Sequence, residues 1–263
     1  MPHYNLAFLG FGNVGKALAE LLLRKAADIV AQRGVTFSVT GIATGSRGIA
    51  IDPNGIDLAK ALELVKSGQS INELNLQPST FNSQTFIENC GADVLFETIP
   101  VNYESGQPAI DYIRAALELG MHVTTANKGP VVHGYHELTA LAKSKGRKFY
   151  FESAVMDGAP VFGLFRETLP AANLNALRGV LNSTTNLLLT RMEAGESFED
   201  AVAYAQSIGI AETDPSGDVD GWDAAIKVCA LVSVMMGVPL KPHDVDRTGI
   251  GGISVDDVAQ AKS

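Results

Sequence analysis

The sequence predicts an α/β fold, with a parallel-sheet domain over residues 1–150 and a smaller α+β domain over residues 151–263. Up to residue 150, short apolar runs alternate with segments of helical spacing, which is typical of a parallel sheet covered by helices. A glycine-rich turn, GFGNVG, joins the first apolar run to the first helical segment. After residue 150 the alternation stops and helical segments dominate, which indicates a second domain.

The first domain begins with an apolar run, NLAFL, that reads as a short buried strand. The helix after it places Leu18, Leu22 and Ile29 on one side. Later strands are apolar runs such as DVLFE, each bounded by turn residues. The predicted order is strand 5–9, helix 14–32, strand 35–43, helix 59–65, strand 93–97, helix 110–119, strand 122–125, helix 138–144 and strand 148–151.

The second domain starts with a predicted helix over residues 161–168 and a strand over residues 177–181. Helices follow at residues 185–194 and 198–208, the latter with Ser197 as its N-cap. A last helix, residues 222–236, is apolar nearly all round, so we expect it to be buried.

Composition excludes several classes of protein. The net charge of -9 makes a phosphate-backbone binder improbable, so we expect no nucleic-acid partner. The longest apolar run, residues 228–240, is too short to cross a bilayer, and we expect no membrane partner. The N-terminus lacks the features of a signal peptide. Two cysteines without C-x-x-C spacing fit a reduced protein, which predicts a cytoplasmic location.

The stretch GFGNVG matches the G-x-G-x-x-G pattern of dinucleotide-binding turns and lies between a strand and a helix, as that pattern requires. Gly10 permits the tight turn, Gly12 lets the backbone approach a pyrophosphate, and Gly15 lets helix and strand pack closely. The helix N-terminus favours the negative charge of the phosphates. The sequence therefore predicts a Rossmann-type domain in which the cofactor contacts Gly10, Gly12, Asn13, Val14 and Gly15. The alternative is a plain strand-to-helix turn.

The end of the second strand bears on the choice of dinucleotide. An NAD site has an acidic residue there, which holds the ribose hydroxyls, but this strand ends in Ala-Thr-Gly-Ser-Arg. Ser46 and Arg47 instead suit a 2′-phosphate, because a guanidinium pairs well with phosphate oxygens. The sequence therefore favours NADP over NAD, and the alternative is that Arg47 is a solvated loop residue.

Two further strand ends carry candidate residues, because ligands of open parallel sheets bind beyond the carboxyl ends of the strands. Thr98 follows the third strand, and Lys128 follows the fourth at the start of a Lys-Gly-Pro sequence. Lys128 is therefore expected near the nicotinamide, and the alternative is an exposed loop lysine.

The apolar helix at residues 222–236 contains Asp223 and Lys227, which share a face because they are four residues apart. A buried ion pair is expensive to desolvate, whereas an exposed pair contributes little. A functional acid/base pair is therefore the favoured interpretation, with an incidental salt bridge as the alternative. The acids before the helix either line a pocket for an ammonium group or belong to a solvated turn at residues 214–217.

Five stretches, taken together, resemble the homoserine dehydrogenase family. They run in order through most of the chain, and the last is the most specific because its acids and its lysine stand in a fixed order. The stretches are GFGNVG, TTANKGPVV at 124–132, FESAVMDGAP at 151–160, LNSTTN at 181–186 and IGIAETDPSGDVDGWDAAIK at 208–227.

The resemblance implies an NAD(P)-dependent enzyme that interconverts L-aspartate 4-semialdehyde and L-homoserine, in the route to threonine and methionine. Lys227 would be the acid/base, Asp223 would orient it, and Lys128 would touch both nicotinamide and substrate. The implied substrate residues are Glu212, Asp218 and Thr184, and the implied further cofactor residues are Thr98 and Ala126. A sodium ion, held largely by main-chain oxygens, would lie at Glu152, Val155, Asp157 and Ala159.

Family members are usually homodimers, which makes a homodimer the expected assembly. They also normally continue beyond the segment matching Ser263, so we expect the second domain to be incomplete at its C-terminal end. A truncated dinucleotide-binding relative with little turnover is therefore the main alternative to an active enzyme. A dehydrogenase of the same fold with another small amino-acid-like substrate is a further alternative.

Overall fold

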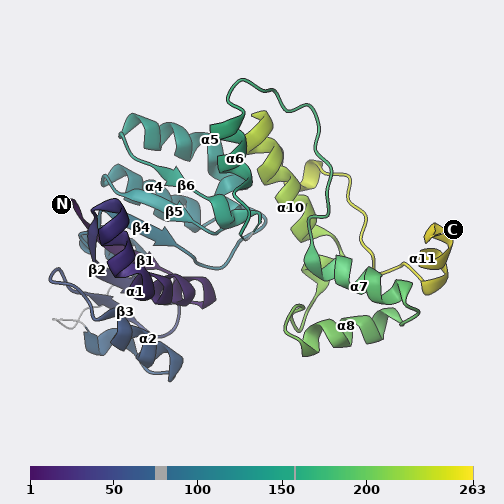
Figure 1. The fold of residues 1–263 in the computed structure, drawn as a ribbon, viewed down its shortest axis with the longest axis horizontal. Coiled ribbons are helices and arrows are strands. Elements are labelled where there is room, and N and C mark those ends of the chain that lie inside the picture. Colours follow the sequence, from purple (N-terminus) through teal and green to yellow (C-terminus); the bar gives the residue numbers. More distant parts are fainter. Residues whose placement is uncertain (75–81, 157, 263) are drawn as a thin grey trace. The chain divides into compact units, whose positions relative to one another are not determined.

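The computed structural model describes residues 1–74, 82–156 and 158–262, and the chain divides into two compact units, Met1–Leu164 and Phe165–Ser263. The first unit contains a sheet with strand order β3-β2-β1-β4-β5-β6 (Figure 1). All its strand pairs are parallel except that of β2 with β3. The predicted α/β class, with a Rossmann-type sheet, is confirmed.

Strands and helices alternate along the first unit as the apolar periodicity predicts. The strands are β1 (His3–Leu9), β2 (Thr36–Ala43), β3 (Ile49–Ile51), β4 (Val94–Glu97), β5 (His122–Thr125) and β6 (Phe149–Tyr150). The helices are α1 (Asn13–Arg33), α2 (Leu58–Lys66), η1 (Ile71–Leu74), α3 (Ser83–Asn89), α4 (Ala109–Glu118), α5 (Lys128–Ser144), η2 (Glu152–Ala154) and α6 (Val161–Thr168).

The strand register brings four carboxyl ends to one edge of the sheet. Leu9 of β1 pairs with Ala43 of β2 on one side and with Glu97 of β4 on the other. Glu97 in turn pairs with Thr125 of β5. The strand order reverses at β1, because β2 lies on one side of it and β4 on the other, so a topological switch point lies between β1 and β4, where ligands of such sheets bind.

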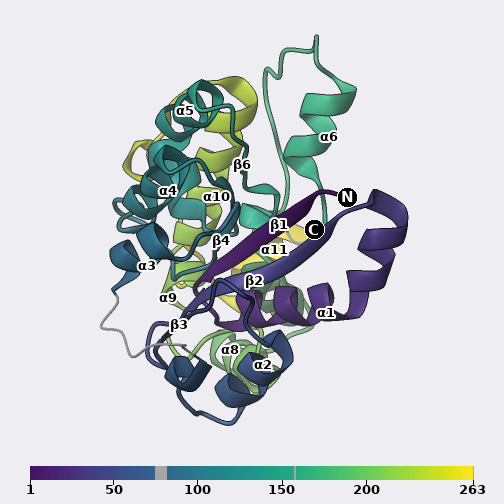
Figure 2. The same ribbon diagram turned by 90° about the vertical axis from the view of Figure 1, so that its left-hand side faces the viewer.

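Alternate residues of the strands pack into two cores, one on each face of the sheet. Leu6 and Phe8 contribute to the core that α1 and α2 cover, and Ala7 and Leu9 to the core that α3, α4 and α5 cover. Figure 2 shows these helices on the two sides of the strands. Burial on both faces explains why the strands are nearly continuous apolar runs.

Some elements of the first unit differ from the sequence prediction. The three-residue β3 and the short α3 were not predicted, because neither segment is long enough to show a clear apolar period. Helix α5 begins at Lys128 rather than at residue 138, so Lys128 and Gly129 belong to a helix and not to a loop. Pro130 is tolerated there because the first helical N–H groups have no intrahelical acceptor.

Within its described residues, the second unit consists of helices and loops. Residues Leu188, Ala201, Ala205 and Val219 form a small core between α7, α8 and α9. The helices are α7 (Ser183–Glu193), α8 (Phe198–Ser207), α9 (Ser216–Val219), α10 (Trp222–Leu231), the π-helical turn η3 (Val232–Met236), η4 (Pro242–Asp244) and α11 (Val255–Lys262).

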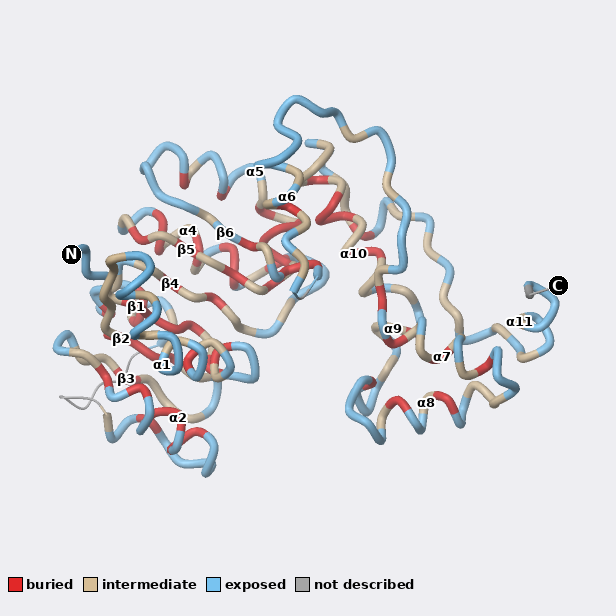
Figure 3. The backbone as a smooth tube through the Cα atoms, viewed as in Figure 1, coloured by how far each residue is buried: buried red, intermediate tan, exposed pale blue. Residues whose placement is uncertain are grey.

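The predicted strand at residues 177–181 is wrong. These residues are irregular, and Val180 is 72% exposed. A strand needs a neighbouring strand to satisfy its N–H and C=O groups, and residues 165–262 provide none. Figure 3 shows much of the connection between α6 and α7 as exposed. The predicted helix at 222–236 is confirmed as α10, which η3 continues.

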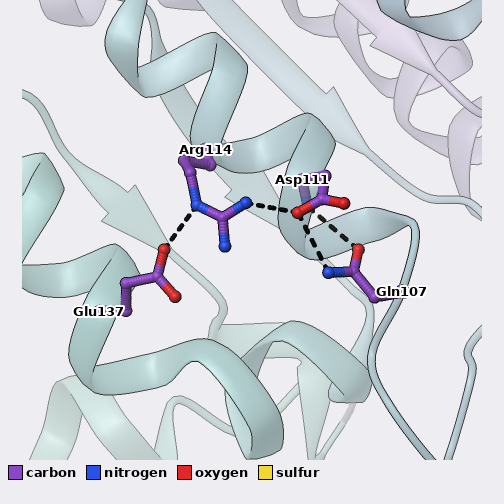
Figure 4. Close-up of polar contacts among 4 residues, drawn as sticks. All are labelled: Gln107, Asp111, Arg114 and Glu137. Carbon is purple, nitrogen blue, oxygen red and sulfur yellow. Dashed lines mark hydrogen bonds and ion pairs between the residues drawn. The ribbon is translucent and has the colours of Figure 1, made fainter.

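An ion-pair network on the surface ties α4 to α5. Arg114 of α4 donates through Nε to Glu137 of α5 at 2.6 Å and also pairs with Asp111 one turn earlier (Figure 4). The Gln107 side chain donates to the same Asp111 carboxylate at 3.1 Å. Across residues 1–74, 82–156 and 158–262, no helix combines the length and the apolar character needed to span a membrane.

Candidate functional site

The glycine turn has the close packing that its pattern predicts. Gly10 has φ of +96°, and a Cβ there would lie 2.6 Å from the carbonyl carbon of Thr98. A Cβ on Gly15 would lie 2.7 Å from the Gly10 carbonyl oxygen. Larger residues at either position would force the turn, β4 and α1 apart, so the glycines are required by packing.

The start of α1 is suited to an anion. Gly12 is its N-cap, and a Cβ on Gly12 would meet no atom of the described chain within 4 Å. Among the residues that the structure describes, no side chain caps this helix, and its first turn contains no acid. The helix N-terminus therefore presents N–H groups and partial positive charge to open space, as a pyrophosphate site does. The residues present fit the dinucleotide predicted from the sequence.

The Thr98 side chain connects the end of β4 to this turn. Its hydroxyl donates a hydrogen bond to the Gly10 carbonyl at 2.9 Å, and its backbone N–H donates to Leu9 at 2.8 Å. Thr98 therefore lies directly beside the glycine turn, on the β4 side of the switch point.

Arg47 lies in a turn just after β2, at the same edge of the sheet. The Arg47 N–H donates to the Thr44 hydroxyl at 2.8 Å, and Thr44 donates to the Gly48 carbonyl at 2.8 Å, which closes the turn. The guanidinium donates to the carbonyl of Val65 in the last turn of α2. Arg47 would have to leave that carbonyl in order to pair with a ribose phosphate.

A buried carboxylate that sequence reasoning missed lies between the ends of β4 and β5. Glu97 is fully buried and accepts hydrogen bonds from the Thr125 hydroxyl, from the backbone N–H of Ile99 at 2.9 Å and from the Asn127 side chain at 3.4 Å. Burial raises the pKa of Glu97 above its ordinary value. The available signal was an acid that ends an otherwise apolar strand.

Lys128 and Ala126 occupy the turn that this network holds. The Asn127 side chain accepts a hydrogen bond from the N–H of Gly129 at 3.0 Å and so caps α5. Lys128 is therefore the first residue of α5, half-buried, in a turn fixed on both sides. The backbone N–H of Ala126 donates to the carbonyl of Glu97 at 3.3 Å.

In the second unit, Asp223 and Lys227 form the predicted ion pair on α10. The Lys227 Nζ lies 2.7 Å from the Asp223 Oδ2, and the two side chains are only 16% and 13% exposed. The same Nζ donates to the backbone carbonyl of Leu181 at 2.8 Å. The lysine is thus held at a fixed place by groups that suit its ammonium form.

Asn182 is a second candidate residue that the sequence did not single out. Its side-chain amide donates to Asp218 at 2.6 Å and to Asp223 at 2.9 Å, and its oxygen accepts from the N–H of Thr185 as the N-cap of α7. One buried side chain therefore joins α7, α9 and α10. An asparagine before a helix is a capping signal, but the sequence does not show that its amide group is used elsewhere.

The remaining predicted substrate residues fall into two groups. Thr184 is buried in the first turn of α7, close in sequence to Asn182, and Asp218 is part of the Asn182 network. Glu212 instead lies on an exposed loop between α8 and α9, where its backbone carbonyl accepts from the Gln206 side chain at 3.1 Å. The structure therefore brings Asp218, Asp223 and Lys227 together and leaves Glu212 exposed.

The predicted sodium residues lie around the start of α6, except that Asp157 is outside the described residues. The Glu152 carboxylate accepts from the N–H groups of Phe162 at 2.8 Å and Gly163 at 2.9 Å. Val155 is buried, and the carbonyl of Ala159 accepts from the N–H of Val161 at 2.9 Å. In the described portions of the chain, no group of three or more metal-binding side chains comes together.

Neither cysteine has the character of a nucleophile. Cys90 and Cys229 are free and buried. Burial, with a smaller contribution from Asp244, raises the pKa of Cys229 to about 11, and burial also raises the pKa of Cys90. Both remain thiols at neutral pH, which disfavours covalent thiol catalysis. A dinucleotide turn and a buried lysine instead suit hydride transfer coupled to proton transfer.

Comparison with known proteins agrees with this chemistry. The sequence model described as "Homoserine dehydrogenase, NAD binding domain" matches residues 10–152, and that described as "Homoserine dehydrogenase" matches residues 160–263. The chain is 36% identical to an NAD(+)-dependent homoserine dehydrogenase from Pseudomonas canavaninivorans, over 100% of this chain and 74% of that protein. It is 38% identical to a homoserine dehydrogenase from Methanocaldococcus jannaschii, over 95% of this chain and 74% of that protein.

Solved structures give the same result. A hyperthermophilic archaeal homoserine dehydrogenase in complex with NADPH superposes with a TM-score of 0.81 at 32% identity, over 96% of this chain and 76% of that one. A homoserine dehydrogenase from Thiobacillus denitrificans has a TM-score of 0.79 at 31% identity, over 100% of this chain and 56% of that one.

Proposed function

Since this chain belongs to the homoserine dehydrogenase family of NAD(P)-dependent oxidoreductases, we propose that it interconverts L-aspartate 4-semialdehyde and L-homoserine with Lys227 as the acid/base. The observation that carries this assignment is the hold on the Lys227 ammonium, which Asp223 and the carbonyl of Leu181 contact at 2.7 and 2.8 Å on a largely buried helix. Reduction of an aldehyde needs one proton at the carbonyl oxygen, and a lysine of fixed position supplies it.

The dinucleotide, when bound, supplies the hydride. The chain's own residues do the rest: the N-terminus of α1 receives the pyrophosphate, and the Lys227 Nζ donates a proton to the oxygen of the aldehyde. Asp223 keeps the Nζ in place and balances its charge. Asn182 holds Asp223 and Asp218 through its amide group. In the reverse direction, the neutral amine of Lys227 accepts the proton of the alcohol.

The substrate carries an ammonium group and a carboxylate, and the chain offers complementary charges. Glu212 receives the ammonium group, Asp218 helps to shape the pocket, and Thr184 lies beside the substrate. Lys128, at the start of α5, touches both substrate and nicotinamide. Glu212 is exposed, so its role requires that the loop between α8 and α9 close on the bound substrate.

For the cofactor we favour NADP over NAD, because no acid follows β2 and Arg47 stands in the turn after it. This choice requires the guanidinium to leave the carbonyl of Val65. Comparison of kcat/KM for NADPH and NADH, in the native chain and in Arg47→Ala, tests it. The variant should lose its preference for NADPH while its kcat/KM for NADH stays the same, whereas an unchanged preference would exclude Arg47.

Two further features of the family remain proposals for this chain. A sodium ion would bind through main-chain oxygens near Glu152, Val155, Asp157 and Ala159, and the protein should then melt at a higher temperature in sodium chloride than in choline chloride of equal ionic strength. A homodimer would give twice the chain mass in size-exclusion chromatography with light scattering.

The main test follows NADPH oxidation in the presence of aspartate 4-semialdehyde. Replacing Lys227 with alanine should lower kcat by roughly 10²- to 10⁴-fold, the range for loss of a general acid, while the affinity for NADPH is retained. Replacing Lys143, an exposed lysine of α5, should leave the rate unchanged. Native-like turnover by Lys227→Ala would refute its role, and NADPH binding without turnover by the native chain would refute the proposed reaction.

A further inference from the structure

Glu97 is a carboxylate that the proposed chemistry does not use, although it lies at the carboxyl ends of the strands. It is the last residue of β4, is fully buried and pairs in register with Thr125 of β5. A buried carboxylate costs stability unless donors surround it. Because burying a carboxylate does not by itself stabilise the fold, we expect Glu97 to have a role at the switch point beside which it lies.

The groups around Glu97 are arranged to donate. The Thr125 oxygen accepts a hydrogen bond from the N–H of Asn127 at 2.9 Å, so the Thr125 hydroxyl proton is directed to Glu97. The N–H of Ile99 and the side-chain amide of Asn127 both donate to the second carboxylate oxygen. Three donors thus converge on two oxygens, an arrangement that suits a carboxylate and not an amide.

This network fixes two segments at once. On one side it holds Ile99 and therefore Thr98, whose hydroxyl bonds the Gly10 carbonyl of the dinucleotide turn. On the other side it holds Asn127, whose side chain caps α5 and so sets the position of Lys128. The carboxylate is the group common to both segments.

The location of these segments relative to the dinucleotide follows from the topology. In such sheets the first strand–helix turn binds the pyrophosphate, and the end of the following strand binds the adenosine ribose. The adenosine half therefore lies toward β2 and Arg47. The nicotinamide half must lie on the other side of the switch point, over the ends of β4 and β5, where Glu97 is.

We propose that Glu97 is a positioning residue that locks the segments 98–99 and 126–128 into the shape that receives the nicotinamide half of the dinucleotide. It acts through Ile99, Thr125 and Asn127 and not by contact with the ligand. This inference rests on the proposed dehydrogenase function. It predicts that loss of the carboxylate harms nicotinamide binding and hydride transfer but leaves the adenosine half unaffected.

Glu97→Gln is the informative variant, because it keeps the volume and one acceptor oxygen. Its amide group faces the Thr125 oxygen, which already accepts from Asn127, so the Thr125 proton loses its acceptor and the turn shifts. The matched control is Val123→Ala, which removes buried volume from the neighbouring strand β5, and the Val123 side chain makes no hydrogen bond in this network.

The experiment measures melting temperature, kcat, and affinity for NADPH and for 2′-phospho-ADP-ribose, which lacks nicotinamide. Glu97→Gln should lose up to about a hundredfold in kcat, as expected for misplaced groups, and bind NADPH more weakly. Its affinity for 2′-phospho-ADP-ribose should stay within about twofold of the native affinity, because a substitution distant from a binding site changes the binding free energy only slightly. Val123→Ala should melt at a lower temperature with native kcat and native affinities.

Native kinetics and affinities in Glu97→Gln would overturn the proposal, as would an equal loss of affinity for both ligands, which indicates a merely structural role. If Glu97→Gln fails to fold, Thr125→Val removes one donor with little change of shape and faces the same criteria. The native chain serves as the reference for function. Its failure to turn over would count against the proposed reaction, whereas the two binding measurements would still decide the role of Glu97.

Discussion

The two units contain contrasting carboxylate networks. In the first unit, the fully buried Glu97 is bonded by a hydroxyl, an amide side chain and a backbone N–H. In the second, Asp223 is 13% exposed and is paired with the Lys227 ammonium at 2.7 Å, with the Asn182 amide as a further donor. Both networks join elements that are distant in sequence, but only the second contains a cation.

The two networks differ in whether they contain a group that can transfer a proton. The groups that donate to Glu97 release protons only at extreme pH, so they can fix a turn but cannot supply a proton. A lysine beside a carboxylate can change its protonation state during a reaction while its position stays the same. We therefore propose that the first network provides rigidity and the second provides proton transfer, and substitutions in either network test this proposal.

Within the second network, the largest effect after that of Lys227→Ala is expected for Asp223→Asn, which keeps the size of the side chain but removes the charge that holds Lys227. A lysine that loses its buried partner is both destabilised and misplaced, so kcat should fall by roughly 10²-fold. Steady-state NADPH oxidation measures this effect. Asp220→Asn, on the exposed turn of the same acidic segment, is the control and should behave as native. Equal rates for both variants would remove the distinction between the two networks.

A smaller effect is expected at Asn182, where capping and orientation can be separated. Aspartate caps a helix as well as asparagine does, so Asn182→Asp should preserve α7. It removes the amide donors, however, and places a third carboxylate near Asp218 and Asp223, so kcat should fall by about tenfold, an order-of-magnitude expectation for lost orientation.

Ser197→Ala is the matched control for this variant, because it removes the N-cap of α8 in the same unit. It should lower stability by about 1 kcal/mol and leave kcat unchanged. Thermal melts and kinetics on both variants decide the outcome. A loss of kcat in Ser197→Ala as large as in Asn182→Asp would mean that capping, and not orientation, accounts for the effect.

From the sequence, only the part of the second network that lies within one element was predicted. Asp223 and Lys227 share a helix face, so their spacing alone was sufficient. Asn182 reaches Asp223 across 41 positions, and no local period records such a contact. Glu97 was read only as the end of an apolar strand, because its partners come from β5 and from the turn after it.

The fold shows the same limit. The five strands predicted for the first domain all form, and central strands such as β1 are apolar runs buried on both faces. The strand expected at residues 177–181 does not form, because strand formation depends on a partner that local sequence does not specify. Secondary structure was predictable where apolar residues repeat along the sequence at helical or strand spacing. It was not predictable where it depends on a partner distant in sequence.

The titration of Glu97 offers a third test of the comparison. Burial raises its pKa above the ordinary value of 4.5, so folding favours the protonated form. The stabilising contribution is fully present below pH 4.5 and is lost as the pH rises through the pKa of the folded state. Glu97→Gln does not titrate at this position, so its melting temperature should gain on that of the native chain as the pH rises above 4.5 and through the folded-state pKa of Glu97.

Melting curves of both proteins across this pH range measure the gain. Val123→Ala, which leaves the carboxylate in place, should differ from the native chain by a constant amount at every pH. A constant difference for Glu97→Gln as well would show that the buried carboxylate titrates as it does in the unfolded chain, and the contrast between the two networks would lose its electrostatic basis.

The smallest effect is expected for the surface network of Arg114, which extends the comparison to exposed charges (Figure 4). The Arg114 side chain is 33% exposed and its partners Asp111 and Glu137 are more than half exposed, so solvent screens both pairs. Arg114→Met keeps the aliphatic packing and should cost less than about 1 kcal/mol, or about 2 °C in melting temperature. A double-mutant cycle with Glu137→Gln isolates the energy of the Arg114–Glu137 pair. This coupling energy should vanish in 1 M salt, because the Debye length there is only about 3 Å. A coupling energy that survives such salt would show that an exposed pair can hold α4 and α5 together as firmly as the buried networks hold their elements. Burial would then not explain why larger effects are expected for substitutions at Glu97 and Asp223.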